Sequence, residues 1–398
     1  MKNSVLFKLI RNERISEDDI NGIEWNEVFQ EAEHQAILIT VFSIAKKYRD
    51  AIPQDIYNKW QNQYYVAVAQ NVKSAIHQKD MLEIISNSAT EKYPYLVFKG
   101  MASAYYWSNP EQRIFGDCDF LIDQQNQHSL EDLFERNGYQ KSGEHGDHHI
   151  VFKNTAGACL EMHYQFNGVP NGNKGNRIKE KLHDVLNHYQ EVFVLNQKFR
   201  MPEAEYHGLI ILLHMQYHMA VEGIGLRHLM DFGYFVENTM FEPFWEDRLI
   251  PFLKEIGLFV YAQVMAKTSS IYCGTKCPCW ASDVDELLCE AIIEDIMVGG
   301  NFGKKNVSRA KSGMLISDHG EKGVKQRKVL NALHTLHTTT PIKYPITKEH
   351  KILYPIFDFW RIIKYFKMVI TGERPSFTKI NQFANNRREL YKQLSLFE

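Results

Sequence analysis

Two aspartates separated by one residue, Asp117 and Asp119, stand in the apolar run GDCDFLI and are the residues best suited to chemistry. Side chains alternate between the faces of a β-strand, so both carboxylates would share one face. Cys118, Phe120 and Ile122 would then pack on the opposite face. Two adjacent carboxylates repel each other unless a cation lies between them. Hard oxygen ligands in this arrangement suit Mg²⁺.

A third acid, Glu161, stands in another apolar run, CLEMHY, which we expect to be a later strand of the same unit. Three carboxylates holding two divalent ions would activate an attacking hydroxyl and stabilise a leaving phosphate. The alternative is a polar strand edge whose acids are merely solvated, because Asp-x-Asp is a common pattern. If the acids do converge, their mutual repulsion predicts that Asp119→Asn leaves the metal-free fold as stable as before.

A small α/β unit from about residue 91 to residue 168 must position these acids. Its pattern predicts a strand at YLVFKG, a helix at MASAYYW, a strand at GDCDFLI and a helix at LEDLFERNGY that stops at Gly138. Two further strands, HHIVFKN and GACLEMHYQF, follow with a hairpin turn between them. Gly100 ends the first strand, and a helix that starts there would offer its N-terminus to an anion.

The flanking regions are predicted to be helical. Residues 1–90 carry apolar side chains at three- and four-residue spacing, and Pro53 separates two of the helices. Residues 178–398 are again mainly helical, most clearly in AEYHGLIILLHMQYHM and GLRHLMDFGYFVEN. The predicted fold class is therefore α+β, with a small mixed-sheet core at 91–168 between a helical N-terminal segment and a larger helical C-terminal region.

The run VFKGMASAYYWSNPEQRIFGDCDFLID, followed by LEMHY, resembles the uncharacterised nucleotidyltransferases of the polymerase-β-like superfamily. The segments LLHMQYH, GIGLRHLMDF and GGNFG resemble the helical half of this family, so the resemblance spans roughly residues 30–305. It implies Mg²⁺-dependent transfer of a nucleoside monophosphate from a nucleoside triphosphate such as ATP to a hydroxyl-bearing acceptor. Pyrophosphate would be the second product.

The resemblance also assigns roles to individual residues. By position, Asp117, Asp119 and Glu161 are the catalytic and metal-binding acids, and Lys99, Gly100, Ser103 and Arg113 are the candidates for binding the triphosphate. Two departures accompany this match: Met101 stands where many members have Ser or Gly, and the interval from Gly100 to Asp117 is long. They support an alternative, a catalytically degenerate member that binds a nucleotide or serves as a scaffold.

A second polar group lies in the helical half. His214 and His218 are four residues apart, and Arg227, His228 and Asp231 follow on the next predicted helix. Such histidines can share a transition-metal ion, as a phosphohydrolase would require. The spacing of Arg227 and Asp231 instead suits an ordinary ion pair within one helix. We favour histidines that brace the helical half against the α/β core.

Three other motifs are better explained by structure than by chemistry. The three cysteines from Cys273 to Cys279 lack the second pair that a zinc site needs. GGNFGKK, at 299–305, lacks the spacing of a phosphate-binding loop and is typical of a helix-ending turn. EHGDHHI, at 144–150, is a polar turn before a strand, although His148 or His149 could face the acids.

The composition is that of a globular protein, with 398 residues, 44% hydrophobic and 24% charged, and a net charge of -2. Intrinsic disorder and collagen-like repeats are thereby excluded. The net charge does not indicate a nucleic-acid partner, and the basic stretch 301–330 is by default a solvated face. The sequence contains no run of about 20 apolar residues, so it does not predict stable membrane insertion. Six cysteines without an export signal suggest reduced thiols and a cytoplasmic location.

The C-terminal run ILYPIFDFWRIIKYFKMVI has an apolar stripe that includes Phe357, Trp360, Ile363 and Ile370. We expect this stripe to pack on the helical domain, with adsorption at a membrane interface as the alternative. The acceptor stays open at this stage: a sugar, a small molecule, a tRNA end and a protein side chain all fit.

Overall fold

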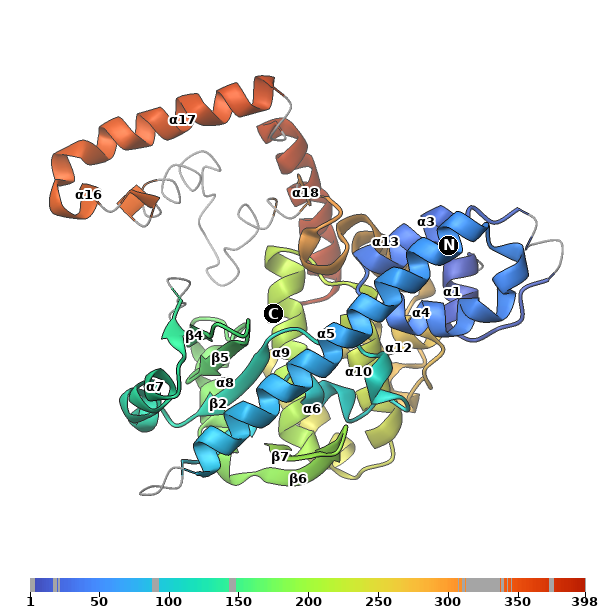
Figure 1. Ribbon diagram of the computed structural model, residues 1–398, viewed down its shortest axis with the longest axis horizontal. Coiled ribbons are helices and arrows are strands. Elements are labelled where there is room, and N and C mark those ends of the chain that lie inside the picture. The colour runs from blue at the N-terminus through green and yellow to red at the C-terminus, as the bar shows by residue number, and fades with distance from the viewer. Residues whose placement is uncertain are drawn as a thin grey trace.

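The computed structural model places a small sheet at one side of a mainly helical body (Figure 1). It describes residues 4–16, 20, 22–87, 93–142, 148–306, 308–309, 312, 337, 340–341, 343–344, 346–371 and 376–397. Most of the basic stretch 301–330, and residues 144–147 of the polar EHGDHHI motif, lie outside these residues.

The N-terminal segment is helical, as predicted. Its elements are α1 (Val5–Ile10), α3 (Trp25–His34), α4 (Leu38–Ala45), the 3₁₀ turn η1 (Lys46–Ala51) and α5 (Gln54–Ser86). Pro53 separates η1 from α5, which confirms the predicted break. The fully buried Trp60 of α5 packs its ring against Phe29 of α3 and Phe42 of α4, with centroid distances of 5.6 and 5.5 Å. This contact fixes α5, which crosses the front of the molecule toward the sheet (Figure 1).

A five-stranded mixed sheet forms the core of the α/β unit. Its strands are β1 (Tyr95–Val97), β2 (Cys118–Ile122), β3 (Gln140–Lys141), β4 (His149–Lys153) and β5 (Cys159–His163), in the order β1-β2-β5-β4-β3. The pair β2–β5 is parallel, and the other neighbouring pairs are antiparallel. The predicted α+β class with a mixed sheet is confirmed. The domain boundaries at 90, 168 and 178 stay predictions.

Short elements connect the strands. They are α6 (Met101–Ala104), η2 (Pro110–Gln112), η3 (Gln124–Asn126) and α7 (Gln127–Arg136). Gly138 follows α7 with a φ of 84°, as a helix-ending glycine should, and Gly157 turns the β4–β5 hairpin with a φ of 81°. One face of β2 is covered by α5, and Phe120 on the same strand also contacts α7. On this face the ring centroids of Phe120 and Phe134 of α7 are 5.7 Å apart, and Cys118 Sγ lies 3.9 Å from Gln78 Oε1 of α5.

The C-terminal region is mainly helical. It contains α8 (Asn173–Leu182), η4 (Val185–Asn187), α9 (Ala204–Val221), α10 (Leu226–Thr239), the π-helical turn η5 (Trp245–Leu249), α11 (Ile250–Ile256), α12 (Phe259–Cys273), η6 (Cys279–Ala281), α13 (Glu286–Gly299), η7 (Asn301–Gly303), α16 (Ile346–Glu349), η9 (Lys351–Leu353), α17 (Tyr354–Ile370) and α18 (Phe377–Gln393). Helix α10 packs against both α9 and α12. Helix α9 also contacts β7, and α10 contacts α6 of the α/β unit.

An unexpected hairpin interrupts this region. Strands β6 (Tyr189–Val194) and β7 (Gln197–Pro202) pair antiparallel, and β7 contacts β1. Leu195 and Asn196 form the two-residue turn with φ values of 47° and 62°. Positive φ at both turn positions matches the right-handed twist of paired strands. Leucine is unusual in that conformation, so the sequence carries little signal for the turn.

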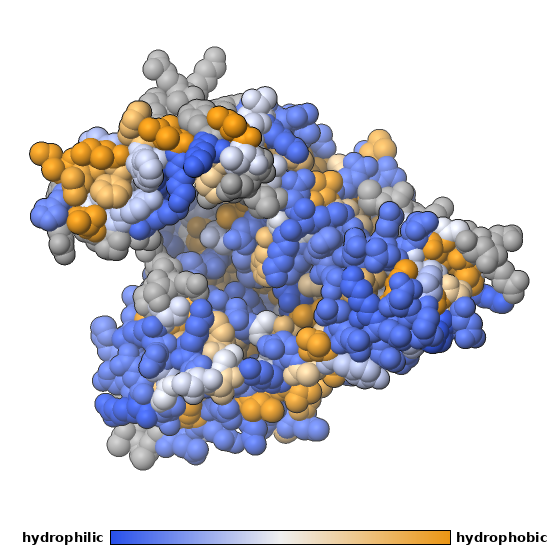
Figure 2. Space-filling model, turned by 45° about the horizontal axis from the view of Figure 1, so that its top comes forward, coloured by the Kyte–Doolittle hydropathy of each residue, from blue (hydrophilic) through white to orange (hydrophobic). Residues whose placement is uncertain are grey.

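Helix α17 does not pack as predicted. Trp360, Ile363 and Ile370 are 56%, 46% and 85% exposed, so the expected packing of this stripe on the helical domain is wrong. The helix stands away from the body at the top left of Figure 1, and apolar side chains gather along it in Figure 2. Within the described part of the chain, no single helix is long and apolar enough to cross a membrane. The pair Trp245–Ile256 and Phe259–Cys273 meets that test only together, across a bend of 115°.

Candidate active site

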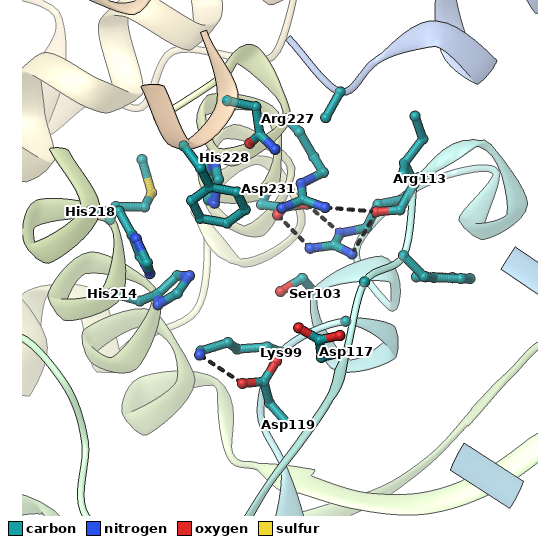
Figure 3. A pocket seen from close by; sticks show the side chains of 18 of the residues that line it. Lys99, Ser103, Arg113, Asp117, Asp119, His214, His218, Arg227, His228 and Asp231 are labelled. Atoms are coloured by element: carbon teal, nitrogen blue, oxygen red, sulfur yellow. Dashed lines mark hydrogen bonds and ion pairs between the residues drawn. The ribbon is translucent and has the colours of Figure 1, made fainter. Parts of the chain in front are cut away.

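A cavity of about 560 Å³ lies between the sheet and the helical half. One wall is formed by β2, β5 and α6, and the other by α9, α10 and η7 (Figure 3). Its volume falls within the range of small-molecule sites. The residues predicted for the site all line it: Lys99, Gly100, Ser103, Arg113, Asp117, Asp119 and Glu161.

The three acids converge on the sheet wall. Asp119 of β2 lies directly opposite Glu161 of β5 in the parallel register. Asp117 immediately precedes β2, and its side chain is exposed to the cavity. Partial desolvation, followed by the negative charges of Glu161 and Asp119, raises the pKa of Asp117. Asp119 and Glu161 belong, with a histidine of β5, to a described group whose ligand atoms are close enough to hold a divalent cation such as Mg²⁺, whereas Asp117 adjoins this group and is not part of it.

Asp119 is already neutralised by neighbouring side chains. Its Oδ1 accepts hydrogen bonds from Lys99 Nζ at 2.8 Å and His163 Nε2 at 3.0 Å. Burial alone would raise the pKa of Asp119, but Lys99 and His163 outweigh it and hold this pKa below its ordinary value. The premise that all three acids only repel one another without metal is therefore wrong for Asp119.

His163 is a site residue that the sequence analysis missed. It follows Glu161 by two residues on β5, and its Nε2 lies 3.3 Å from Glu161 Oε2. The ligand atoms of Asp119, Glu161 and His163 all fall within 4.8 Å of one another. The strand alternation in LEMHY, which places Glu161 and His163 on one face, was the available signal. An imidazole beside two carboxylates also admits ions softer than Mg²⁺.

Two more histidines adjoin this group. His149 of β4 is paired with His163 in register, and their rings stack at 5.0 Å. His148, His149 and His163 form a second set whose ligand atoms lie within 4.8 Å of one another. The sequence allowed either His148 or His149 to face the acids, and in the structure both rings lie close to that of His163.

The turn at Gly100 joins β1 to α6. Gly100 has a φ of 57° and a ψ of -110°, a conformation that side chains strongly disfavour. Helix α6 starts at Met101 but is a single turn, and the side chain of Met101 is buried in the core with 3% exposure. Met101 therefore does not line the cavity, whereas Ser103, the third residue of α6, does. The hydroxyl available to a phosphate is therefore that of Ser103.

Arg113 lines the cavity, but its guanidinium is bound elsewhere. Its Nε and one terminal nitrogen donate to the two oxygens of Asp231 at 2.7 and 2.8 Å. Trp107 Nε1 donates to the same carboxylate at 2.9 Å. Asp231 thus pairs with Arg113, and not with Arg227 as the sequence spacing favoured. The ion pair between Arg113 and Asp231 ties the loop before Asp117 to α10.

Imidazoles form much of the helical wall (Figure 3). The rings of His214 and His218 on α9 are 4.3 Å apart, and His214 lies 5.8 Å from His228 on α10. Burial lowers the pKa of all three, which keeps them neutral near pH 7. The described groups able to hold a metal ion include none of them. Their position between the helical half and the core agrees with the bracing role that we favoured.

The glycine-rich segment at 299–305 is a helix-ending turn, as predicted. Gly299 closes α13, Gly300 has a φ of 68°, and η7 follows. The segment also contributes Asn301, Phe302 and Lys304 to the cavity, which the sequence did not indicate. Phe302 has a φ of 55° and packs its ring 5.2 Å from that of His228.

Comparison with protein families matches residues 21–270 to a family described as uncharacterised nucleotidyltransferase. The matched range contains all three acids, the Gly100 turn and the three wall histidines. Among solved structures, the chain is similar to an antigenic nucleotidyltransferase-like protein from Paracoccidioides brasiliensis, with 13% identity and a TM-score of 0.29. That alignment covers 55% of this chain and 96% of the other. No curated protein matches the sequence.

Proposed function

We propose, from the premise that the chain belongs to the uncharacterised nucleotidyltransferase family, that it is an active, divalent-metal-dependent enzyme. It transfers a nucleoside monophosphate from a nucleoside triphosphate to a hydroxyl-bearing acceptor and releases pyrophosphate. The observation that carries the proposal is the convergence of Asp117, Asp119 and Glu161 on one wall of a cavity beside the Gly100 turn.

Each residue of the sheet wall has a task in this reaction. Asp117 and Asp119 would hold Mg²⁺, which when bound supplies charge stabilisation to the transferring phosphate. Glu161 would orient the acceptor hydroxyl and take its proton as the acceptor oxygen bonds to the α-phosphorus and pyrophosphate departs. Lys99 and Ser103, with the backbone at Gly100, would hold the triphosphate. We assign Arg113 to positioning, because its guanidinium is bound to Asp231.

Transfer of label from two forms of ATP to an acceptor in a cell extract tests this function. Label at the α-phosphate should enter a product, whereas label at the γ-phosphate should leave as pyrophosphate. Sensitivity of the product to nuclease or protease would separate an RNA acceptor from a protein, and a small acceptor would survive both. The other nucleoside triphosphates are assayed in the same way.

Two variants make the assay specific. Asp119→Asn should reduce incorporation by several orders of magnitude, since charge stabilisation of the transferring phosphate depends on the ion it helps to hold. Asp132→Asn, at an exposed acid on α7, should not change it. Entry of the γ-label into the product, or equal incorporation by Asp119→Asn and wild type, would contradict the proposal.

A second candidate is nucleotide binding without turnover. The ion pair between Lys99 and Asp119 favours it, because an ammonium group already compensates a carboxylate proposed to bind metal. This candidate predicts that ATP stabilises the protein equally with Mg²⁺ and with EDTA, and that no label is transferred. Stronger stabilisation with Mg²⁺ and ATP together favours the enzyme.

A further inference from the structure

Two guanidinium groups, Arg113 from the loop before Asp117 and Arg227 from α10, are buried near the single carboxylate of Asp231. Arg113 and Asp231 neutralise each other through two hydrogen bonds. Arg227 is only 8% exposed, and its hydrogen bond to Ile114 O, at 3.0 Å, involves an uncharged acceptor. No described carboxylate lies within ion-pair distance of Arg227. Burial and the nearby Arg113 lower the pKa of Arg227 to about 10, so the group stays charged at pH 7.

Unsatisfied polar atoms accompany this excess charge. Arg227 Nε is buried without a hydrogen-bond partner. His228 Nδ1 accepts from the backbone N–H of Gly225 at 3.3 Å, so the proton of the neutral ring resides on Nε2, which is also buried and unpartnered. The side-chain oxygen of Asn301 is unpartnered as well, and a flip of that amide would present a third donor. All three residues line the cavity.

The backbone at the start of α10 does not account for these atoms. The N–H of Leu226 donates to the side chain of Gln35 at 3.1 Å, and the N–H of Arg227 donates to the Gln35 carbonyl at 3.3 Å. The helix N-terminus is thus already satisfied by α3 and its following turn. The unpartnered donor atoms are themselves buried, and they belong to residues that line the cavity. Buried donors without partners cost free energy until an anion meets them, and the nearest carboxylates act on the charge of Arg227 only from beyond ion-pair distance.

We propose that Arg227 and His228, with Asn301 beside them, form a phosphate-binding subsite on the helical wall, opposite Asp117 and Asp119 (Figure 3). A guanidinium edge and a separate imidazole N–H, presented from different directions, suit the tetrahedral oxygens of a phosphate. The phosphate is either the terminal group of the nucleotide or a group carried by the acceptor. Phosphate binding at this subsite does not depend on the proposed function, but the choice between nucleotide and acceptor as the source of the phosphate does.

Binding of inorganic phosphate and pyrophosphate in EDTA tests the subsite without metal or turnover. The melting temperature of wild type should rise with either anion relative to chloride at equal ionic strength. Arg227→Met should weaken the binding at least tenfold. Asp132→Asn and Lys304→Met, which alter an exposed acid on α7 and an exposed cavity lysine, should keep it. An equal rise in Arg227→Met and wild type, or no rise in wild type, would overturn the subsite.

Stability without anion provides an internal check on the same variants. Arg227→Met should melt at or above the wild-type temperature, because Arg227 has no carboxylate to leave behind. Arg113→Met should melt lower, because it strands Asp231. Should Arg227→Met fail to fold, His228→Asn replaces it: the new side-chain oxygen can accept from Gly225 N–H, and the Nε2 donor is lost. Unchanged phosphate binding by His228→Asn and by Arg227→Lys would together count against the subsite.

Calorimetry with Mg²⁺ identifies the source of the phosphate. A tenfold loss of affinity by Arg227→Met for ATP but not for AMP assigns the subsite to the nucleotide's own terminal phosphate. Unchanged ATP affinity, with inorganic phosphate binding the ATP-saturated wild type but not the variant, assigns it to a phosphorylated acceptor. If phosphate binds through Arg227 while no label is transferred in the extract assay, the proposed function fails and the subsite stands.

Discussion

At the scale of single residues, the acid cluster contains two carboxylates in opposite electrostatic conditions. Asp119 is buried and accepts from Lys99 and His163, which lower its pKa. Asp117 is exposed to the cavity, and desolvation and the other two acids raise its pKa. At pH 7 the charge on Asp119 therefore contributes stability, whereas the charge on Asp117 reduces it.

We expect the two neutralising variants to change the metal-free fold in opposite directions. Asp119→Asn should lower the free energy of unfolding at pH 7 by about 1–3 kcal/mol, because two buried donors lose their charged acceptor. Asp117→Asn should leave it unchanged or raise it. Urea unfolding in EDTA measures both. The stabilising effect of Asp119 should begin to decline as the pH falls below its unfolded-state pKa near 3.8, and it should vanish only below the lower pKa of the folded state. Equal effects of the two substitutions would contradict this assignment.

Residue types in the sequence could predict which acids meet, but not what neutralises them. Asp-x-Asp and the later Glu161 are visible through strand alternation. The contact between Lys99 and Asp119 depends on the antiparallel pairing of β1 with β2, which brings residues 20 positions apart together. The contact of His163 depends likewise on the parallel β2–β5 pairing. Strand order, which the pattern did not determine, decides the charge balance of the site.

At the scale of elements, the long interval between Gly100 and Asp117 is held from two sides. On α5, Asn71 Nδ2 donates to the carbonyls of Glu111 and Arg113 at 3.0 and 2.8 Å. Its Oδ1 accepts from the N–H of Phe115 at 2.8 Å. From α10, Asp231 binds Arg113. The interval is therefore an ordered support that leads directly into Asp117.

Asn71→Leu should remove the α5 side of this support at nearly constant volume. Three hydrogen bonds of about 0.5–1.5 kcal/mol each predict a loss of about 1.5–4.5 kcal/mol in the free energy of unfolding. Under the proposed function, transfer should fall at least tenfold, because Asp117 follows the loosened segment. Chemical unfolding and the label assay measure these effects. Asn58→Leu, at an exposed position of the same helix, is the control, and equal behaviour of the two variants would refute the supporting role.

Element patterns were predictable where they are local. The helix-ending Gly138 and the break at Pro53 follow from the chain itself, and both are confirmed. The β6–β7 hairpin was missed because its turn contains Leu195 in a conformation typical of Asn or Gly. On α17 the apolar stripe was predicted, but its packing was not. An amphipathic pattern identifies an apolar face and does not say whether the same chain covers it.

At the scale of the whole molecule, the helical half and the sheet meet through buried histidines. His207 on α9 accepts from the hydroxyl of Tyr106 and donates to the carbonyl of Phe98, each at 3.1 Å. His214, His218 and His228 form the cavity wall beyond it. The α+β architecture could be predicted from the order of the elements. This interface could not, because it joins segments about a hundred residues apart.

These histidines predict that stability decreases in mild acid. Burial lowers the pKa of His207 to about 4 and also lowers that of His214, His218 and His228. The nearby cations Lys99 and Arg227 lower the pKa of His214 further. At His218, Glu222 favours protonation and so partly offsets the lowering of the pKa by burial. In the unfolded chain each ring titrates near 6.5, so unfolding takes up protons below that pH.

The free energy of unfolding should therefore fall as the pH drops below about 6.5, by about 1.4 kcal/mol per pH unit for each histidine that stays neutral when folded. Urea unfolding from pH 7.5 to pH 5.0 measures this slope, and calorimetric proton uptake gives the number of groups. His207→Gln removes one titrating group and should reduce the slope by about one such increment, whatever it does to absolute stability. His128→Gln, at a side chain that is 93% exposed, should leave the slope unchanged. A free energy of unfolding that is constant over this range would show that the interface protonates while folded, and the neutral histidine wall would then be wrong.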